Sequence, residues 1–408
     1  MRVLALVRDG SLKKSFAWRG ISDVPRTRLF ANGKDPSVTE RCHTGQTLPN
    51  ARKPSIPTIP SPRPLLRVEG LQTHLDSCSP PLKVVDDVHL AISPGETFAL
   101  LGESGCGKSM MALSLMRLLP PSGRITAGHV WLGDTSLLAL PESAMRQVRG
   151  GRMGMIFQEP QTSLNPVLTV GHQIAEAVSA HSERNHREIS ARVLELLDAV
   201  GIPDPKRRIR EYPHQLSGGM KQRVMIAMAL AGDPELLIAD EPTTALDVTI
   251  QAQVLRLLKR LQGETGLAVL LITHDLGVVA ETADRLAVMY AGQIVEAASS
   301  LDFFAHSAHP YSRKLKDSLP ASEKRQGRLA VIPGRVPPLN QVFQGCHFAG
   351  RCDHVMAICR DLVPEWVEPR PGHRVRCHLW ASDQLGLARF AQSVPLFKPE
   401  EIPASVLA

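Results

Sequence analysis

Residues 97–109 read TFALLGESGCGKS, an apolar run that leads directly into a glycine-rich loop. The loop, from Gly102 to Ser109, matches the phosphate-binding pattern G-x-x-x-x-G-K-S. After it, apolar residues recur at helical spacing up to Leu119, and the proline pair at 120–121 is expected to end this helix. Because strand, loop and helix follow in the order that the pattern requires, the sequence predicts an α/β P-loop fold with a mainly parallel sheet.

The chemistry of this loop suits a nucleoside triphosphate. Its glycines allow successive backbone N–H groups to point at an anion. Lys108 is expected to neutralise the β- and γ-phosphates, and the Ser109 hydroxyl to ligate Mg²⁺. The same N–H dipoles and Lys108 are expected to favour the thiolate form of Cys106, and the alternative is a buried thiol that reagents cannot reach. The predicted ATP- and Mg²⁺-binding residues of the loop are Gly102, Ser104, Gly105, Cys106, Gly107, Lys108 and Ser109.

A second apolar strand, residues 236–241, ends in two carboxylates. Asp240 suits a carboxylate that orders Mg²⁺, and Glu241 points to the opposite face because side chains alternate along a strand. We expect Glu241 to be the general base that accepts a proton from the attacking water. Two such carboxylates can also cap a surface strand, but the phosphate loop in the same chain favours the catalytic interpretation.

Residues 217–223 read SGGMKQR and lie between these two nucleotide motifs. A serine N-cap followed by two glycines leaves free N–H groups at the positive end of a helix dipole. The three motifs, in this order, resemble those of the nucleotide-binding subunit of an ABC transporter. The resemblance implies a head-to-tail dimer in which this segment caps the γ-phosphate bound to the partner, so that the isolated chain is a poor ATPase. It assigns this capping to Ser217, Gly218, Gly219 and Gln222.

The same resemblance gives roles to three single polar residues. Gln158, in the run IFQEP, matches the Q-loop residue that contacts Mg²⁺ and faces the membrane subunit. Asp247 matches the D-loop, and His274, at the end of LLITH, matches the switch histidine that touches the γ-phosphate. The aromatic residue that commonly stacks on adenine is missing ahead of the strand at 84–92. His74 stands in that stretch, and it either stacks on adenine or is an ordinary surface histidine.

Net charge and hydropathy argue against a nucleic-acid-binding protein and against a membrane-spanning one. The chain has 47 Lys and Arg against 40 Asp and Glu, a net charge of +7. Residues 1–60 hold 11 of the basic and 4 of the acidic residues, which leaves 36 of each in the rest of the chain. With no net basic field there, and with 4% aromatic residues, nucleic-acid binding is not expected. No apolar run approaches the ~18–20 residues that span a bilayer, so we expect a cytoplasmic protein that reaches a membrane through its partners.

Four of the seven cysteines lie close together near the C-terminus, with the spacing C-x5-C-x6-C-x17-C. In a reducing compartment such a group favours a metal site over disulfides. Zinc ribbons bring their ligands in tight C-x2–4-C pairs, which this spacing lacks, so a cubane iron–sulfur cluster suits it at least as well. Zinc, or four buried thiols that only pack together, are the alternatives. The candidate ligands are Cys346, Cys352, Cys359 and Cys377.

Further stretches narrow the family: TSLNP at 162–166, IADEPTTALDVTIQAQV at 238–254, HPY at 309–311 and IPG at 332–334. With the cysteines, they resemble the ATPase subunits of dipeptide, oligopeptide and nickel ABC importers over about residues 65–385. The resemblance implies ATP hydrolysis that powers peptide import, with nickel or another small solute as the alternative, and a C-terminal 4Fe–4S cluster. A soluble ABC ATPase without a transport role is disfavoured, because the ATPase domain is single and uninterrupted.

The partners that the resemblance implies are two transmembrane permease subunits and a second ATPase subunit, homologous rather than identical. A periplasmic solute-binding protein would act indirectly, and the chain would sit at the cytoplasmic face of the inner membrane.

The predicted organisation has four parts: a basic, proline-rich extension at 1–63, an ABC ATPase domain at 64–315, a cysteine module at 316–385 and a tail at 386–408. Apolar residues at helical spacing from Ile189 to Val200 predict a helical subdomain at about 159–230. The ATPase domain is expected to add an antiparallel β subdomain to the mainly parallel core.

Overall fold

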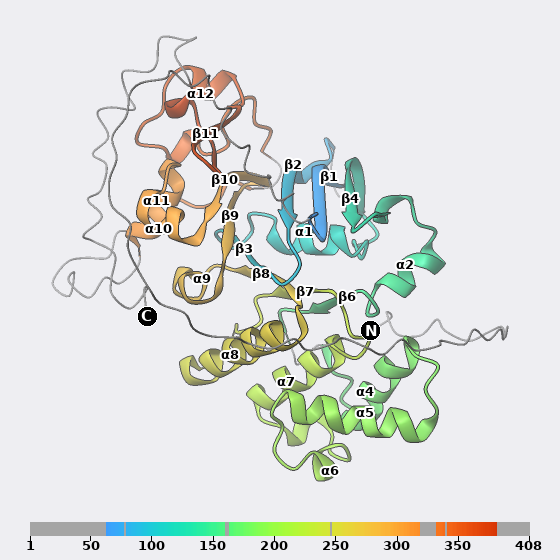
Figure 1. Ribbon diagram of the computed structural model, residues 1–408. Coiled ribbons are helices and arrows are strands. Elements are labelled where there is room, and N and C mark those ends of the chain that lie inside the picture. Colours follow the sequence, from blue (N-terminus) through green and yellow to red (C-terminus); the bar gives the residue numbers. More distant parts are fainter. Residues whose placement is uncertain are drawn as a thin grey trace, which may run out of the picture. The chain divides into compact units, whose positions relative to one another are not determined.

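The structure is a computed structural model that describes residues 63–76, 79–159, 163–244, 247–318, 332–338 and 341–381 (Figure 1). Except for Arg63, the predicted extension at 1–63 lies outside the described residues, as does the predicted tail at 386–408. Among the helices of the described part, none is long and apolar enough to cross a membrane.

The core of the protein is a sheet in which five adjacent strands run parallel, in the order β9-β3-β8-β7-β6. Strand β3 lies between β8 and β9, so the phosphate loop that follows it starts from the interior of the sheet. All residues of β3, β7 and β8 are buried, as expected for parallel strands that are covered on both faces. The five strands are β3 (Thr97–Leu101), β6 (Met153–Ile156), β7 (Leu236–Asp240), β8 (Ala268–Thr273) and β9 (Arg285–Tyr290). The predicted mainly parallel core is confirmed.

A second, antiparallel sheet of four strands has the order β2-β1-β4-β5. It packs through buried residues such as Val68 and Val85 into the same hydrophobic cluster as Met111 of helix α1 and Ile238 of the main sheet. Its apolar face therefore covers the helix that follows the phosphate loop. The elements are β1 (Leu66–Leu75), β2 (Leu82–Ile92), α1 (Lys108–Leu115), β4 (Gly123–Leu132), β5 (Thr135–Ser136) and the neighbouring α2 (Glu142–Val148).

Helix α1 ends at Leu115, earlier than the predicted end at Pro120. Arg117 takes a left-handed conformation, with φ of 50°, and the Leu118 N–H donates to the carbonyl of Leu113 at 2.8 Å. This turn closes the helix before the prolines are reached, because a residue in the left-handed region cannot continue it.

The stretch predicted as a helical subdomain contains a group of helices that pack on one another (Figure 1). In α5, Val193, Leu196 and Leu197 are buried at helical spacing, and Asn185 and Glu188 form a capping box that starts the helix. The helices are α4 (Val170–Ala180), α5 (His186–Ala199), α6 (Pro205–Arg208) and α7 (Gly218–Ala229), and the chain then returns to the main sheet and to α8 (Val248–Thr265) and α9 (Leu276–Thr282).

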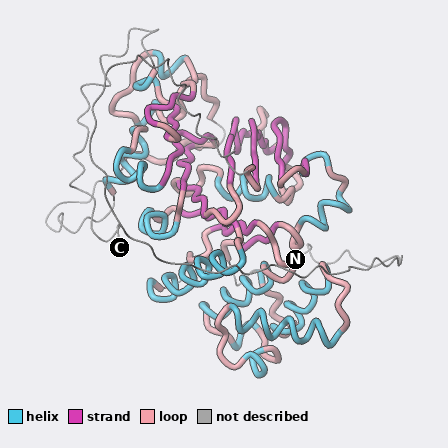
Figure 2. The backbone as a smooth tube through the Cα atoms, viewed as in Figure 1, coloured by secondary structure: helices cyan, strands magenta, loops and turns pink. Residues whose placement is uncertain are grey.

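The C-terminal strands are built into the main sheet. Strand β10 pairs antiparallel with β9, β12 pairs with β10 and β11 with β12, so that the sheet has eight strands. Figure 2 shows the backbone coloured by helix, strand and loop. We call residues 332–338 and 341–381 the C-terminal segment. The elements of this end of the chain are β10 (Gln293–Ser299), α10 (Ser300–His306), α11 (Pro310–Asp317), α12 (Ile358–Asp361), β11 (Trp366–Arg370) and β12 (His373–Arg376).

The reason for this attachment is a buried carboxylate. Glu296 of β10 is 0% exposed and accepts hydrogen bonds from Ala308 N at 2.8 Å, from His309 N at 2.7 Å and from His373 Nε2 at 2.8 Å. It therefore ties β12 and the start of α11 to β10. The expectation of a cysteine-rich module beside the ATPase core is not supported, because these residues complete the sheet of that core.

Candidate nucleotide site

The phosphate loop is closed around Lys108, the first residue of α1. Its Nζ donates to the carbonyl oxygens of Gly102 at 2.8 Å and Glu103 at 3.0 Å. A Cβ on Gly107 would lie 2.3 Å from the Val84 carbonyl oxygen, and this residue has φ of 107°, so only glycine fits there. The loop is thus wrapped over an ammonium group, with Ser104 and Gly105 exposed at its tip.

The two predicted Mg²⁺-binding side chains contact each other. Ser109 Oγ donates to Asp240 Oδ1 at 3.1 Å, although the two residues are 131 positions apart. Burial raises the pKa of Asp240 above its ordinary value, and the charge of Glu241 adds to this, whereas the hydrogen bond from Ser109 opposes it. A hydroxyl beside a buried carboxylate is a suitable pair of oxygen ligands for Mg²⁺.

Glu241 is the centre of a hydrogen-bonded group. Gln158 Nε2 and Thr244 Oγ1 each donate to its Oε2 at 2.9 Å, and His274 Nδ1 lies 3.1 Å from its Oε1. Its backbone is held in a left-handed conformation, φ 47°, by a 2.9 Å bond from its N–H to the Ile272 carbonyl. The structure thus brings together Glu241, Gln158 and His274, which the sequence predicted from three separate motifs.

Thr244 was not predicted as part of this group. The signal was present, because its hydroxyl follows Glu241 by three residues in the run Asp-Glu-Pro-Thr-Thr. Burial acts to raise the pKa of Glu241, but hydrogen bonds from Thr244 and His274 outweigh it and leave this pKa below its ordinary value. Glu241 is therefore ionised at neutral pH and able to accept a proton.

The state of the Cys106 thiol differs from the predicted thiolate. Its side chain is 0% exposed, and burial raises the pKa of the thiol, an effect that the nearby Lys108 charge does not overcome. The ammonium is 3.9 Å from the sulfur and makes shorter bonds to the two loop carbonyls. The predicted thiolate is wrong, because the side chain points into the core beneath the loop rather than towards the N–H dipoles.

The signature segment opens α7. Ser217 Oγ accepts from Met220 N at 3.3 Å, and Ser217 and Gly218 are exposed. A Cβ on Gly219 would lie 2.7 Å from a methyl carbon of Ile250 in α8, so this glycine permits the close approach of the two helices. Gln222 lies one turn further along α7 and is buried.

Asp247, the predicted D-loop residue, is the N-cap of α8, and the signature segment packs against this helix. Asp247 Oδ1 accepts from Ile250 N at 3.0 Å and caps α8. The D-loop and the signature segment therefore meet at the same residue, Ile250. The two residues before Asp247 lie outside the described part of the chain.

Two other places contribute less to the nucleotide site. His74, on β1, is half-buried and burial lowers its pKa, and its contact with adenine stays a prediction.

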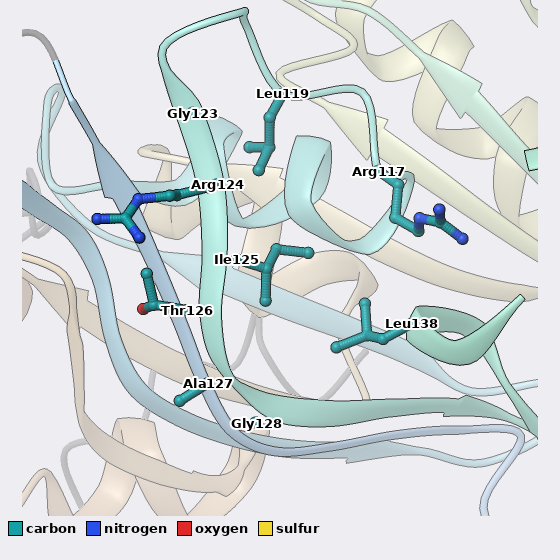
Figure 3. A pocket seen from close by; sticks show the side chains of 9 residues that line it. All are labelled: Arg117, Leu119, Gly123, Arg124, Ile125, Thr126, Ala127, Gly128 and Leu138. Atoms are coloured by element: carbon teal, nitrogen blue, oxygen red, sulfur yellow. The ribbon is translucent and has the colours of Figure 1, made fainter. Parts of the chain in front are cut away.

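A cavity of about 500 Å³ lies between β4 and the end of α1 (Figure 3). Its Arg117 donates to the carbonyls of Leu137 and Leu140 at 3.1 and 2.7 Å. The residues that line this cavity include none of the predicted site residues.

The four C-terminal cysteines influence one another. Burial raises the pKa of Cys346 to about 11 and that of Cys377 to about 12, and the charges of Cys352 and Cys359 add to both shifts. The Cys346 N–H donates to the Cys359 carbonyl at 2.8 Å. In the described part of the chain, however, no three His, Cys, Asp or Glu side chains are arranged to hold a single metal ion.

Comparisons with known proteins agree with this geometry. Residues 85–244 match the ABC transporter family, and residues 295–359 match the oligopeptide/dipeptide transporter C-terminal region. A probable peptide ABC transporter ATP-binding protein of Sinorhizobium fredii is 52% identical over 79% of this chain and 96% of its own length. The dipeptide transport ATP-binding protein of Bacillus subtilis is 46% identical over 78% of this chain and 95% of its own length.

Among solved structures, the chain resembles a dimeric ATP-binding cassette in a post-hydrolysis state bound to ADP and phosphate. The identity is 28% and the TM-score 0.52, over 58% of this chain and 98% of the cassette. Fold, nucleotide motifs and relatives agree, and the chain belongs to the ATP-hydrolysing subunits of the ABC transporter family.

Proposed function

We propose that this chain powers an ABC importer of dipeptides or oligopeptides. The observation that carries the proposal is the combination of the Glu241 group with the match of residues 295–359 to the peptide transporter C-terminal region. The relatives named above, which are described as peptide and dipeptide transport proteins, support the same class of substrate.

In the proposed reaction, a water oxygen attacks the γ-phosphorus of ATP, the bond to the bridging oxygen breaks, and ADP leaves. Glu241 accepts the proton of the water, while Gln158, Thr244 and His274 fix its carboxylate in one orientation. The Lys108 ammonium binds the β- and γ-phosphates in place of the loop carbonyls. Ser109 and Asp240 would hold Mg²⁺, which supplies neutralising charge to the phosphate oxygens.

The proposed active form is a head-to-tail pair of ATPase subunits. The exposed N-terminus of α7, with Ser217 and Gly218, offers free N–H groups to the γ-phosphate on the partner, with Gly219 and Gln222 in the same signature segment. Asp247 lies next to this segment, because it accepts a hydrogen bond from the N–H of Ile250, the residue that Gly219 approaches closely. On this proposal the partner is a homologous second ATPase. Both ATPases dock on two permeases at the cytoplasmic face of the inner membrane, and a periplasmic binding protein delivers the solute.

The test is substrate-stimulated ATP hydrolysis by the complex reconstituted in vesicles. Dipeptides and oligopeptides of graded length are added with the binding protein, and nickel salts are added in a parallel series. We expect stimulation by peptides and none by nickel. The same complex with Glu241→Gln controls for contaminating ATPases. Stimulation by nickel alone would replace the peptide proposal with the nickel alternative.

We also propose that the four cysteines hold a 4Fe–4S cluster. What supports the proposal is that Cys346, Cys352 and Cys359 lie near enough to Cys377 to influence the pKa of its thiol, and that a cubane takes four thiolate ligands. The residues that would hold it are Cys346, Cys352, Cys359 and Cys377.

Anaerobic purification tests the cluster. We expect brown protein with about four irons per chain, and loss of the colour in Cys377→Ser but not in Cys106→Ser, which removes a buried thiol outside the group. Colourless protein with stoichiometric zinc would overturn the iron–sulfur assignment, and metal-free protein with all four thiols reactive on unfolding would leave only packing.

A further inference from the structure

Arg351 of the C-terminal segment makes a forked ion pair with Glu103, the second residue of the phosphate loop. Its Nη1 donates to Glu103 Oε1 at 3.1 Å and its Nη2 to Oε2 at 3.2 Å. The two residues are 248 positions apart in the sequence, and their side chains are 9% and 27% exposed, respectively. Because the guanidinium meets both carboxylate oxygens, it fixes the orientation of Glu103 as well as neutralising its charge.

The guanidinium is itself held in place. Arg351 Nε donates to the Pro333 carbonyl at 2.9 Å, Nη1 to the Tyr290 hydroxyl at 3.4 Å and Nη2 to the Gly334 carbonyl at 3.5 Å. On the main chain, Lys314 Nζ donates to the carbonyl oxygen of Arg351 at 3.0 Å. The side chain therefore has little freedom to leave Glu103.

A second residue holds the backbone of Glu103. Its N–H donates to the hydroxyl of Tyr311 at 3.0 Å. Tyr311 is fully buried, and its ring centroid lies 4.7 Å from that of Tyr290 and 5.3 Å from that of Phe348. Tyr311 and Arg351 both lie within residues 295–359, outside the stretch that matches the ABC transporter family itself. Both contacts to Glu103 thus come from the peptide transporter region of the chain.

The charge of Glu103 matters because the ligand of the loop is a polyanion. The Glu103 carbonyl already accepts from Lys108 Nζ, so this residue borders the place where the phosphates are expected. An unpaired carboxylate there would repel the triphosphate, and it would compete with the phosphates for the Lys108 ammonium. The fork from Arg351 prevents both effects.

We infer that Arg351 is a positioning residue for ATP binding, which neutralises Glu103 and holds its carboxylate away from the triphosphate, while Tyr311 holds the backbone of the first turn of the phosphate loop through the Glu103 N–H. The C-terminal segment therefore has a task at the nucleotide site.

The test compares Arg351→Ala, Glu103→Ala and the double variant in the full-length protein. MgATP affinity is measured by calorimetry, and KM and kcat are measured in the reconstituted complex. We expect Arg351→Ala to raise Kd and KM about tenfold, with a much smaller change in kcat. Glu103→Ala alone should stay within about twofold of the wild type, and the double variant should return to about the same value, because the repelling charge is gone.

The matched control is Arg360→Ala, because Arg360 is an exposed arginine that also adjoins a cysteine of the group. It should bind MgATP as the wild type does. An Arg351→Ala protein with unchanged Kd would overturn the inference. So would a double variant as weak as Arg351→Ala, because Arg351 would then only support the fold of its own segment. If Arg351→Ala does not fold, Arg351→Gln takes its place, because glutamine keeps a donor for the Pro333 carbonyl. An unchanged Kd of Arg351→Gln, or a double variant with Glu103→Ala that binds as weakly, would then overturn the inference.

Discussion

Replacing Glu296 by glutamine should detach the C-terminal strands from the sheet. The carboxylate is fully buried and accepts from three donors, two at its Oε1 and one, His309 N, at its Oε2. An amide keeps one acceptor oxygen, so its NH₂ group must face either His309 N–H or the donors from Ala308 and His373. At least one buried donor then loses its partner, and the remaining bonds lose the contribution of the negative charge.

The magnitude follows from these contacts. A hydrogen bond to a charged group contributes about 1.5–3 kcal/mol, and an unsatisfied buried donor costs about 1–3 kcal/mol. We therefore expect Glu296→Gln to lower the free energy of unfolding by about 3 kcal/mol, or the melting temperature by about 6–10 °C. The effect should be concentrated at β12, because His373 starts this strand.

Hydrogen exchange read by mass spectrometry measures this locally, and thermal unfolding measures it globally. Amides of β12 and of the start of α11 should exchange faster, whereas those of β7 and β8 should change little. Glu281→Gln is the control, since it removes an exposed carboxylate from α9 and should change stability by less than about 0.5 kcal/mol. If Glu296→Gln melts like this control and β12 keeps its protection, the carboxylate does not hold the strands.

Three further predictions concern the ATP site and its surroundings. Glu241→Gln should keep MgATP affinity and lower the turnover of the complex at least ~100-fold, because the amide cannot accept the proton; turnover above a tenth of the wild type would exclude Glu241 as the principal base. Burial lowers the pKa of His309 to about 4 from its ordinary 6.5, so unfolding takes up a proton and stability falls as pH drops from about 6.5 towards 4. His309→Asn, which can still accept from Tyr311 N, should flatten this dependence in melting curves at pH 7.5 and 5.5; an unchanged slope would rule out His309 as its source. Cys106 should resist alkylation in the native protein and react on unfolding, as mass spectrometry would show, and labelling as fast as that of a small free thiol would contradict its burial.

The sequence predicted those parts of the site that are local. The phosphate loop, the carboxylates Asp240 and Glu241 and the cap of α7 each lie in one short run whose residue types are set by the chemistry of phosphate. The phosphate loop and the two carboxylates meet in space because strands β3 and β7, which carry them, both lie beside β8 in the parallel sheet and end at the same edge.

Features that depend on distant residues were not predicted. The burial of Cys106 is decided by what packs beneath the loop, and nothing in the run GESGCGKS reveals it. The same holds for the pairing of Glu103 with Arg351, which joins two ordinary surface residue types across 248 positions. The strands of the C-terminal segment were not predicted because β11 and β12 are short, with five and four residues, and carry more charged than apolar side chains.

The late position of β12 has a consequence for how the protein is made. Synthesis proceeds from the N-terminus, and domains tend to fold as their last strands emerge. Until residue 376 has left the ribosome, β10 is an open edge that carries apolar residues such as Ile294 and Val295, and such an edge can pair with another chain. Chains that terminate early, after the ATPase motifs but before β12, should therefore aggregate or be degraded.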